Sequence, residues 1–164
     1  MRWINHNATA FCVTYAVSAN PVLSVIAAVS ATVPDAVEHL PLFHRHRGVS
    51  HDILLWVPVS SLLWIMTYVP IGGILAISHL AGLLQLVVLG VILGVMMHLI
   101  TDGLSALGVP VLRKYRFAAG WYKTFTWSEY KISLCICLPC LAVCLALGRL
   151  SPKLGNLMMY LNLA

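Results

Sequence analysis

Residues 34 to 52 read PDAVEHLPLFHRHRGVSHD, and this polar stretch divides a chain that is apolar on both sides. The chain has only 5 acidic residues and 7 histidines, and the stretch holds three of the acids and four of the histidines. These residues are Asp35, Glu38, His39, His44, His46, His51 and Asp52. Ionisable groups gathered within so apolar a chain must face water, pair with one another or bind a metal ion. The segments on either side decide among these three options.

The composition predicts an integral membrane protein with a single domain, residues 1–164. Apolar residues make up 60% of the chain and charged residues 9%, whereas about 25% charged residues are usual in soluble domains. The net charge of +5 comes from basic residues scattered near the ends of apolar segments. This distribution indicates contact with lipid headgroups, not with nucleic acid. We therefore expect the lipid bilayer as a partner, and the sequence leaves an oligomer open.

The apolar segments predict an all-α polytopic membrane helix bundle with about five transmembrane helices. The first two helices are expected at residues 5–19 and 21–33, separated by the turn-forming pair Asn20-Pro21. Both are shorter than the roughly 20 residues that cross a bilayer squarely. We prefer a hairpin to one long helix kinked at Pro21, because a hairpin brings His6 back beside Asp35.

Three further spans are expected at residues 50–68, 81–104 and 132–147. A short re-entrant or interfacial piece ending at His79 is expected to precede the middle one. Residues 108–131 mix basic and aromatic side chains, and this mixture is typical of a segment that lies at the membrane interface.

The last apolar span carries four of the five cysteines, Cys135, Cys137, Cys140 and Cys144. We interpret them as small packing residues of a membrane helix, with a metal or redox cluster as the alternative. A short amphipathic piece is expected after Ser151.

Threading these helices back and forth through a membrane places the ionisable residues on one face. The fourth span returns His98 and Asp102 to the side of the 34–52 stretch, and the first helix begins on that side with His6. All 5 acidic residues and six of the seven histidines then share one face. The same face holds eight of the ten lysines and arginines, so the positive-inside rule predicts that it is cytoplasmic.

Two pairs of residues have the spacing of metal ligands. His98 and Asp102 are four residues apart and point to the same side of a helix. A simple His–Asp hydrogen bond would also explain them, but ionisable groups within an apolar span are functional by default. Asp35 and Glu38 are three residues apart and can share a helix face, with a solvated helix end as the alternative.

The densest group of candidate ligands is the segment HRGVSHD, residues 46–52. Gly48 permits a turn across which His46 and His51 can face each other. Asp52 can orient one of these histidines through a hydrogen bond without binding the ion itself.

The remaining histidines differ in how strongly they are predicted to take part. His44 and its neighbour Arg45 fit ordinary loop polarity, and His39 stays undecided. His6 can serve as a helix cap or as a ligand, and the expected hairpin favours the ligand. Arg2 and the apolar run after it imitate a secretion signal, but we expect this segment to be retained because His6 has a use in the site.

These motifs resemble the YdjM-like proteins, which are described as LexA-regulated, inner-membrane, metal-dependent hydrolases. The shared features are a histidine near the start (His6), the Pro34-Asp35 pair, H-R-G-x-[ST]-H at residues 46–51, H-x3-D at residues 98–102, Gly108-Val109-Pro110 and a late acid (Glu129). Together they cover residues 6–129. The chain departs from the family pattern P-D-x-D, because its second carboxylate is Glu38, one position later and one carbon longer.

The resemblance implies a metal-dependent hydrolase of the inner membrane. The predicted metal ligands are His6, Asp35, Glu38, His46, His51, His98 and Asp102. Mixed imidazole and carboxylate ligands suit Zn or Mn best, and this number suffices for two ions, which can activate a water and stabilise a leaving oxygen. The predicted catalytic residues are Asp52, Glu129 and Arg47.

The expected substrate is a membrane-associated anionic molecule, with a phosphoester of a lipid or lipid-linked compound as the leading choice. Arg47, Arg113, Lys114 and Lys123 could neutralise its phosphate. The sequence contains no nucleophile elbow and no Gly-rich phosphate loop. Two other functions remain open, a small metal or ion transporter and a non-catalytic membrane protein with a structural metal.

Overall fold

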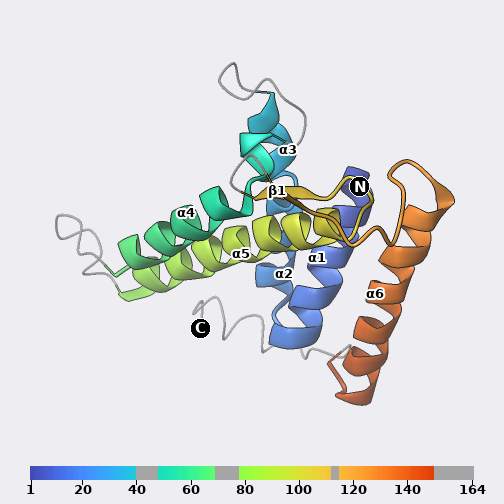
Figure 1. Cartoon of the computed structure of the whole chain (residues 1–164). Helices are drawn as coiled ribbons and strands as arrows, with labels where there is room; N and C mark the ends of the chain where they lie inside the picture. Colours follow the sequence, from blue (N-terminus) through green and yellow to red (C-terminus); the bar gives the residue numbers. More distant parts are fainter. Residues whose placement is uncertain (40–47, 69–77, 112–114, 150–164) are drawn as a thin grey trace.

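The computed structural model describes residues 1–39, 48–68, 78–111 and 115–149, and helices hold most of them (Figure 1). In chain order the elements are α1 (Trp3–Ser18), α2 (Pro21–Ser30), α3 (Val33–Glu38), the 3₁₀ turn η1 (Val49–His51), α4 (Ile53–Met66), α5 (Ser78–Gly103), β1 (Val109–Val111), β2 (Tyr115–Phe117) and α6 (Trp127–Ala146). The predicted helical class is confirmed. The sequence did not predict the two strands, which form a short antiparallel hairpin.

Three segments of the described chain are long and apolar enough to cross a membrane. They are Pro21–Glu38, which joins α2 and α3, Ala81–Gly103 and Trp127–Ala146. α1 has 16 residues and α4 has 14, both short of the roughly 20 that span a bilayer. The structure therefore supports three of the five expected spans by length and composition.

The predicted break between the first two helices is present. α1 ends at Ser18, and Ala19 adopts a left-handed conformation with φ of 54°. Asn20 then caps α2 by accepting a hydrogen bond from the backbone N–H of Leu23 at 3.0 Å, and Pro21 is the first residue of α2. α1 packs against α2 and α6, so residues 3–30 form two packed helices and not one kinked helix.

α5 is the central helix, and it contacts α1, α2, α3, α4 and β1 (Figure 1). It packs closely on α2 because Gly90 and Gly94 face the α2 backbone. A Cβ at Gly94 would collide with the carbonyl oxygen of Ala27 and lie 2.8 Å from the backbone nitrogen of Ala31. Small residues at such a contact let two helix backbones approach each other.

Several expected boundaries differ from the structure. His79 belongs to α5 itself, so the separate piece expected to end there is wrong for residues 78–79. The expected third helix divides into η1 and α4, because Asp52 lies between them in an extended conformation and caps α4. α6 starts at Trp127 and not near residue 132, so Glu129 lies in its first turn. The piece expected after Ser151 lies outside the described residues.

The buried apolar core is small. One cluster consists of Trp56, Val95, Leu99 and Val109, and another contains Tyr15, Ala16 and Cys144. Cys140 packs against the second cluster, so Cys140 and Cys144 fit the prediction of packing residues, whereas Cys135 is exposed. Many large apolar side chains along the helices are exposed, as expected for helices that face lipid.

Candidate metal centre

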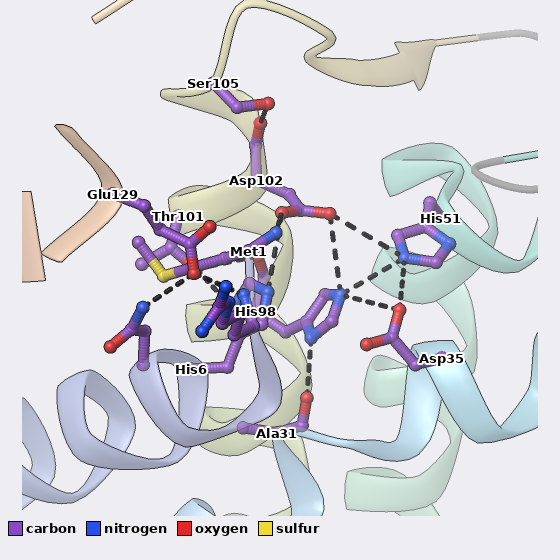
Figure 2. A network of polar contacts seen from close by, with 12 residues as sticks. Met1, His6, Ala31, Asp35, His51, His98, Thr101, Asp102, Ser105 and Glu129 are labelled. Carbon is purple, nitrogen blue, oxygen red and sulfur yellow. Dashed lines mark hydrogen bonds and ion pairs between the residues drawn. The ribbon is translucent and has the colours of Figure 1, made fainter. Parts of the chain in front are cut away.

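The structure brings six of the seven predicted metal ligands together from four separate segments. Figure 2 shows His6, Asp35, His51, His98 and Asp102. His6 comes from α1, Asp35 and Glu38 from α3, His51 from η1, and His98 and Asp102 from α5. The seventh, His46, lies outside the described residues, as does Arg47. His6, His51, His98 and Asp102 are almost fully buried, with exposed fractions of 0–1%.

Four candidate ligand atoms lie close to the two histidines, namely Nε2 of His51, Nε2 of His98, Oδ1 of Asp35 and Oδ2 of Asp102. His51 Nε2 lies 3.1 Å from His98 Nε2, 3.1 Å from Asp35 Oδ1 and 3.8 Å from Asp102 Oδ2. His98 Nε2 lies 3.6 Å from Asp35 Oδ1 and 3.7 Å from Asp102 Oδ2. We call this group the four-atom site.

Five separations within the four-atom site are close to those expected around a tetrahedral metal ion. Metal–nitrogen and metal–oxygen bonds of about 2.0–2.2 Å place tetrahedral ligands roughly 3.3–3.6 Å apart. The five separations above run from 3.1 to 3.8 Å. Asp35, His51 and His98 could therefore hold a divalent ion, and Asp102 Oδ2 lies 3.8 and 3.7 Å from Nε2 of His51 and His98.

Hydrogen bonds hold the His98 ring in the form that a metal requires. Its Nδ1 lies 2.6 Å from the carbonyl oxygen of Ala31. A carbonyl can only accept, so Nδ1 carries the hydrogen and a neutral His98 presents a lone pair at Nε2. Such a bond from the second ring nitrogen is the usual way in which proteins orient a histidine ligand.

The His51 ring has acceptors near both of its nitrogens. Ser50 Oγ lies 3.0 Å and Glu38 Oε2 3.7 Å from Nδ1, while Asp35 lies beside Nε2. Without an ion, an Nε2 hydrogen can bond to Asp35. With an ion, the hydrogen can reside on Nδ1, where Ser50 Oγ can accept it and the Glu38 carboxylate lies nearby. Glu38 is thus placed to support His51 as well as to bind an ion.

His6 forms a second group with Asp102. Its Nδ1 lies 2.8 Å from Thr101 Oγ1, and this hydroxyl also lies 2.8 Å from the carbonyl oxygen of Met97. Since the Thr101 hydroxyl can donate to Met97, it accepts from His6 Nδ1, and His6 Nε2 is left with a lone pair. Burial lowers the pKa of His6, although the neighbouring Asp102 acts in the opposite direction, so the ring favours the neutral form.

The Nε2 atom of His6 is buried and has no hydrogen-bond partner within the described residues. It lies 3.4 Å from Asp102 Oδ1, and its ring stacks on His98 with the ring centres 3.8 Å apart. The amino group of Met1 lies 2.9 Å from the same Asp102 oxygen. A lone pair facing a carboxylate is repulsive, so this place favours a cation.

Glu129 and Asp52, the two carboxylates predicted to be catalytic, accept hydrogen bonds from backbone N–H groups. Glu129 is fully buried and accepts hydrogen bonds from Arg2 N at 2.5 Å, Asn5 Nδ2 at 2.6 Å and Phe125 N at 2.8 Å. It therefore ties the start of α1 to the loop before α6. Asp52 accepts from Leu54 N at 3.0 Å and caps α4.

A cavity of about 770 Å³ lies beside the ligands, and we call it the site cavity. Asp35, Glu38 and Asp102 line it, as do the apolar side chains of Trp3, Leu107 and Phe125. Arg2 and His39 also line it. His39, undecided from the sequence, is thus near the site, although it belongs to neither buried group of candidate ligands.

Sequence reasoning missed the groups that hold the ligands, namely the Ala31 carbonyl, Thr101, Asn5 and the Met1 amine. Thr101 had a detectable signal, because it is a polar residue three positions after His98 in an otherwise apolar helix. The Ala31 carbonyl had none, since every residue carries such a group.

Comparison with known proteins adds no relative, because no protein-family model, curated protein or solved structure matches the chain. The interpretation of the site therefore depends on its geometry.

Proposed function

We propose that this protein is a membrane-bound, metal-dependent hydrolase, and that it acts on a phosphoester of a lipid or lipid-linked substrate at the cytoplasmic face of the inner membrane. The resemblance of its motifs to the YdjM-like proteins is part of this proposal. The observation that carries it is the four-atom site, in which two imidazoles from separate segments lie 3.1 Å apart and 3.1–3.8 Å from carboxylate oxygens of Asp35 and Asp102.

A cation explains an arrangement that would otherwise be costly. The carboxylates of Asp35 and Asp102 bring negative charge beside buried imidazoles, and a cation would balance this charge. Asp102 and His98 are at most 1% exposed, and both lie within the apolar span Ala81–Gly103. Nitrogen and oxygen ligands in a nearly tetrahedral group favour zinc, with manganese as the second choice.

We propose that His6 and Asp102 would hold a second ion. The unpartnered Nε2 of His6, 3.4 Å from Asp102 Oδ1, supports this place. Bound ions would supply an activated water and would polarise the phosphoryl group.

Neighbouring groups orient the candidate ligands and determine which ring nitrogen of each histidine carries the hydrogen. Ala31 and Thr101 hold the lone pairs of His98 and His6 toward the ions. Ser50 Oγ can accept the proton that His51 keeps on Nδ1, and the Glu38 carboxylate lies nearby. The site cavity gives a substrate access to Asp35 and Asp102. Because Glu129 and Asp52 bind backbone N–H groups, we assign them to positioning these elements.

The test is elemental analysis of the purified protein together with hydrolysis of phosphoesters by the same samples. Wild type should carry zinc or manganese and release phosphate, and His98→Ala should lose both. His79→Ala is the matched control, because His79 lies in the same helix near its opposite end. If wild type carries no more metal than His98→Ala, the proposal fails.

The main alternative to a hydrolase is a protein whose metal is structural. The candidate ligands join α1, α3, η1 and α5 and are mostly buried, as a structural metal site would require. Under that alternative, metal-loaded wild type would hydrolyse no phosphoester, and ligand variants would lose stability without any activity to lose. The site cavity favours the hydrolase, because three of the candidate ligand residues line an open space that a substrate can enter.

A further inference from the structure

Arg2 is a cationic side chain on the wall of the site cavity, and the site as described so far does not use it. The carboxylates of Asp35, Glu38 and Asp102 line the cavity, as do the apolar side chains of Trp3, Leu107 and Phe125. Among the described residues that line this cavity, Arg2 is the only lysine or arginine. A ligand in this space would meet the metal-binding carboxylates, one guanidinium and apolar surface.

Hydrogen bonds hold both the backbone and the side chain of Arg2. Its backbone N–H donates to Glu129 Oε1 at 2.5 Å. Its guanidinium donates from Nη1 to the hydroxyl of Tyr130 at 2.6 Å, and its central carbon lies 5.5 Å from the centre of the Tyr130 ring. The stacked position and the hydrogen bond orient a group that has five N–H donors. Little conformational entropy then remains to be lost when it binds an anion.

Arg2 is also close to the candidate ligands along the backbone. The amino nitrogen of the preceding residue, Met1, lies 2.9 Å from Asp102 Oδ1, and adjacent Cα atoms are about 3.8 Å apart. An anion that reaches the ions can therefore lie within reach of a long arginine side chain.

We propose that Arg2 binds the anionic group of the substrate, and that this substrate is a phosphate ester with an apolar remainder. This inference rests on the proposed function and specifies its substrate class. A single fixed guanidinium suits one phosphate group shared with the metal ions. A polyphosphate would need more cations than the described wall provides. The apolar side chains suit an acyl or isoprenoid chain.

The surroundings of Arg2 indicate entry from the membrane interface. Arg2 also lines a neighbouring cavity of about 680 Å³ together with Phe125, Trp127 and Tyr130. Phe125 is 71% exposed and Trp127 is 81% exposed. Exposed aromatic side chains beside an arginine are typical of the headgroup region of a bilayer, where the phosphate of a lipid lies.

The test measures binding to the zinc-loaded full-length protein by isothermal titration calorimetry. The probes are inorganic phosphate, soluble dioctanoyl phosphatidate, and nanodiscs that contain either dioleoyl phosphatidate or only phosphatidylcholine. Arg2→Ala should weaken phosphatidate binding about tenfold or more, as expected for a lost charge-assisted hydrogen bond. Arg2→Lys should have an intermediate effect, because it keeps the charge but loses the planar fork of donors.

Controls separate recognition from folding. Lys131→Ala removes one exposed positive charge from the first turns of α6 and should leave binding unchanged. All Arg2 variants keep the backbone bond to Glu129, so their thermal midpoints and zinc content should match wild type. Where hydrolysis is measurable, Arg2→Ala should raise KM for phosphatidate more than it lowers kcat.

The outcomes distinguish this inference from the proposed function. Equal phosphatidate affinity of wild type and Arg2→Ala, or no anion binding by wild type, overturns the role of Arg2. Weaker binding by Arg2→Ala without any hydrolysis by wild type supports the role of Arg2 while the hydrolase proposal fails. Equal binding of inorganic phosphate and phosphatidate would overturn the apolar part of the substrate class.

Discussion

His98 donates a hydrogen bond from Nδ1 to the carbonyl oxygen of Ala31 at 2.6 Å. Ala31 follows the last residue of α2, while His98 lies near the end of α5. The bond fixes which nitrogen of the ring faces the four-atom site. Gly94 lies one turn before His98 and is in contact with Ala27 and Ala31. The close packing of two apolar helices therefore sets the orientation of a candidate metal ligand.

Gly94→Ala should destabilise the fold and weaken metal binding. Its Cβ would collide with the α2 backbone, and such overpacking typically costs about 1–3 kcal/mol. Separation of the helices would also lengthen the bond from His98 to Ala31. Thermal unfolding in detergent and zinc affinity would both report the change.

Gly82→Ala is the matched control, because a Cβ at Gly82 has no other atom within 4 Å. Alanine should stabilise that position in α5 slightly, by up to about 1 kcal/mol. Equal stability of the two alanine variants would contradict the close contact between α5 and α2.

Metal should raise the unfolding temperature of wild type, and a chelator should reverse the effect. An ion at one hundred times its Kd stabilises a folded protein by about 2.7 kcal/mol. Asp35→Asn should lose most of this increase. Asp52→Asn keeps an oxygen that can accept the Leu54 N–H at the α4 cap, and it should keep the increase with metal. The reverse pattern would assign the ligand role to Asp52.

His6→Ala should lower the metal content from two ions to one. His6 belongs to the group of His6, His98 and Asp102 but not to that of Asp35, His51 and His98, whereas His98 belongs to both groups. His98→Ala should therefore lose both ions. Metal-to-protein ratios from elemental analysis measure this directly, with His79→Ala as the control. A wild-type ratio of one would leave only the four-atom site.

Glu129→Gln should destabilise the protein while leaving its metal content unchanged. Both oxygens of Glu129 accept N–H groups, and an amide NH₂ would face one of these donors without a bond. An unsatisfied buried donor costs about 1–3 kcal/mol. Asn5→Ala, which removes one of the donors, should cost less. Loss of bound metal in Glu129→Gln at unchanged stability would instead make Glu129 a ligand.

The side of the membrane can be tested by labelling cysteines in a variant that lacks the five native ones. Lys131 and Leu147 are exposed and lie near opposite ends of α6. A membrane-impermeant maleimide should label Lys131→Cys only from the cytoplasmic side and Leu147→Cys only from the other side. The opposite pattern would reverse the predicted topology.

Local patterns in the sequence predicted a large part of this fold. The pair Asn20-Pro21 marked the end of one helix and the cap of the next, because both residues act on the backbone within a few positions. The four-residue spacing of His98 and Asp102 placed their ligand atoms on one side of α5 for the same reason. The β hairpin was missed because its strands have three residues each, too few for a periodic pattern.

Non-local contacts could be anticipated only in part. Threading the apolar segments predicted that His6 would meet the other ligands, and its ring does stack on His98. The part played by Glu129 was not predictable, because its three donors come from positions 2, 5 and 125. Two of these donors are backbone groups, which no residue type reveals.

The sequence by itself determined which segments are apolar helices and which side chains can bind a metal, because hydrophobicity and ligand chemistry belong to single residues and their spacing. Only the tertiary structure decided that His51, His98, Asp35 and Asp102 meet at 3.1–3.8 Å and that His6 keeps an unpartnered nitrogen. These distances depend on how closely α5 packs on α2 and on where η1 returns to α5. Such packing reflects contacts between residues far apart in the chain, which no local pattern records.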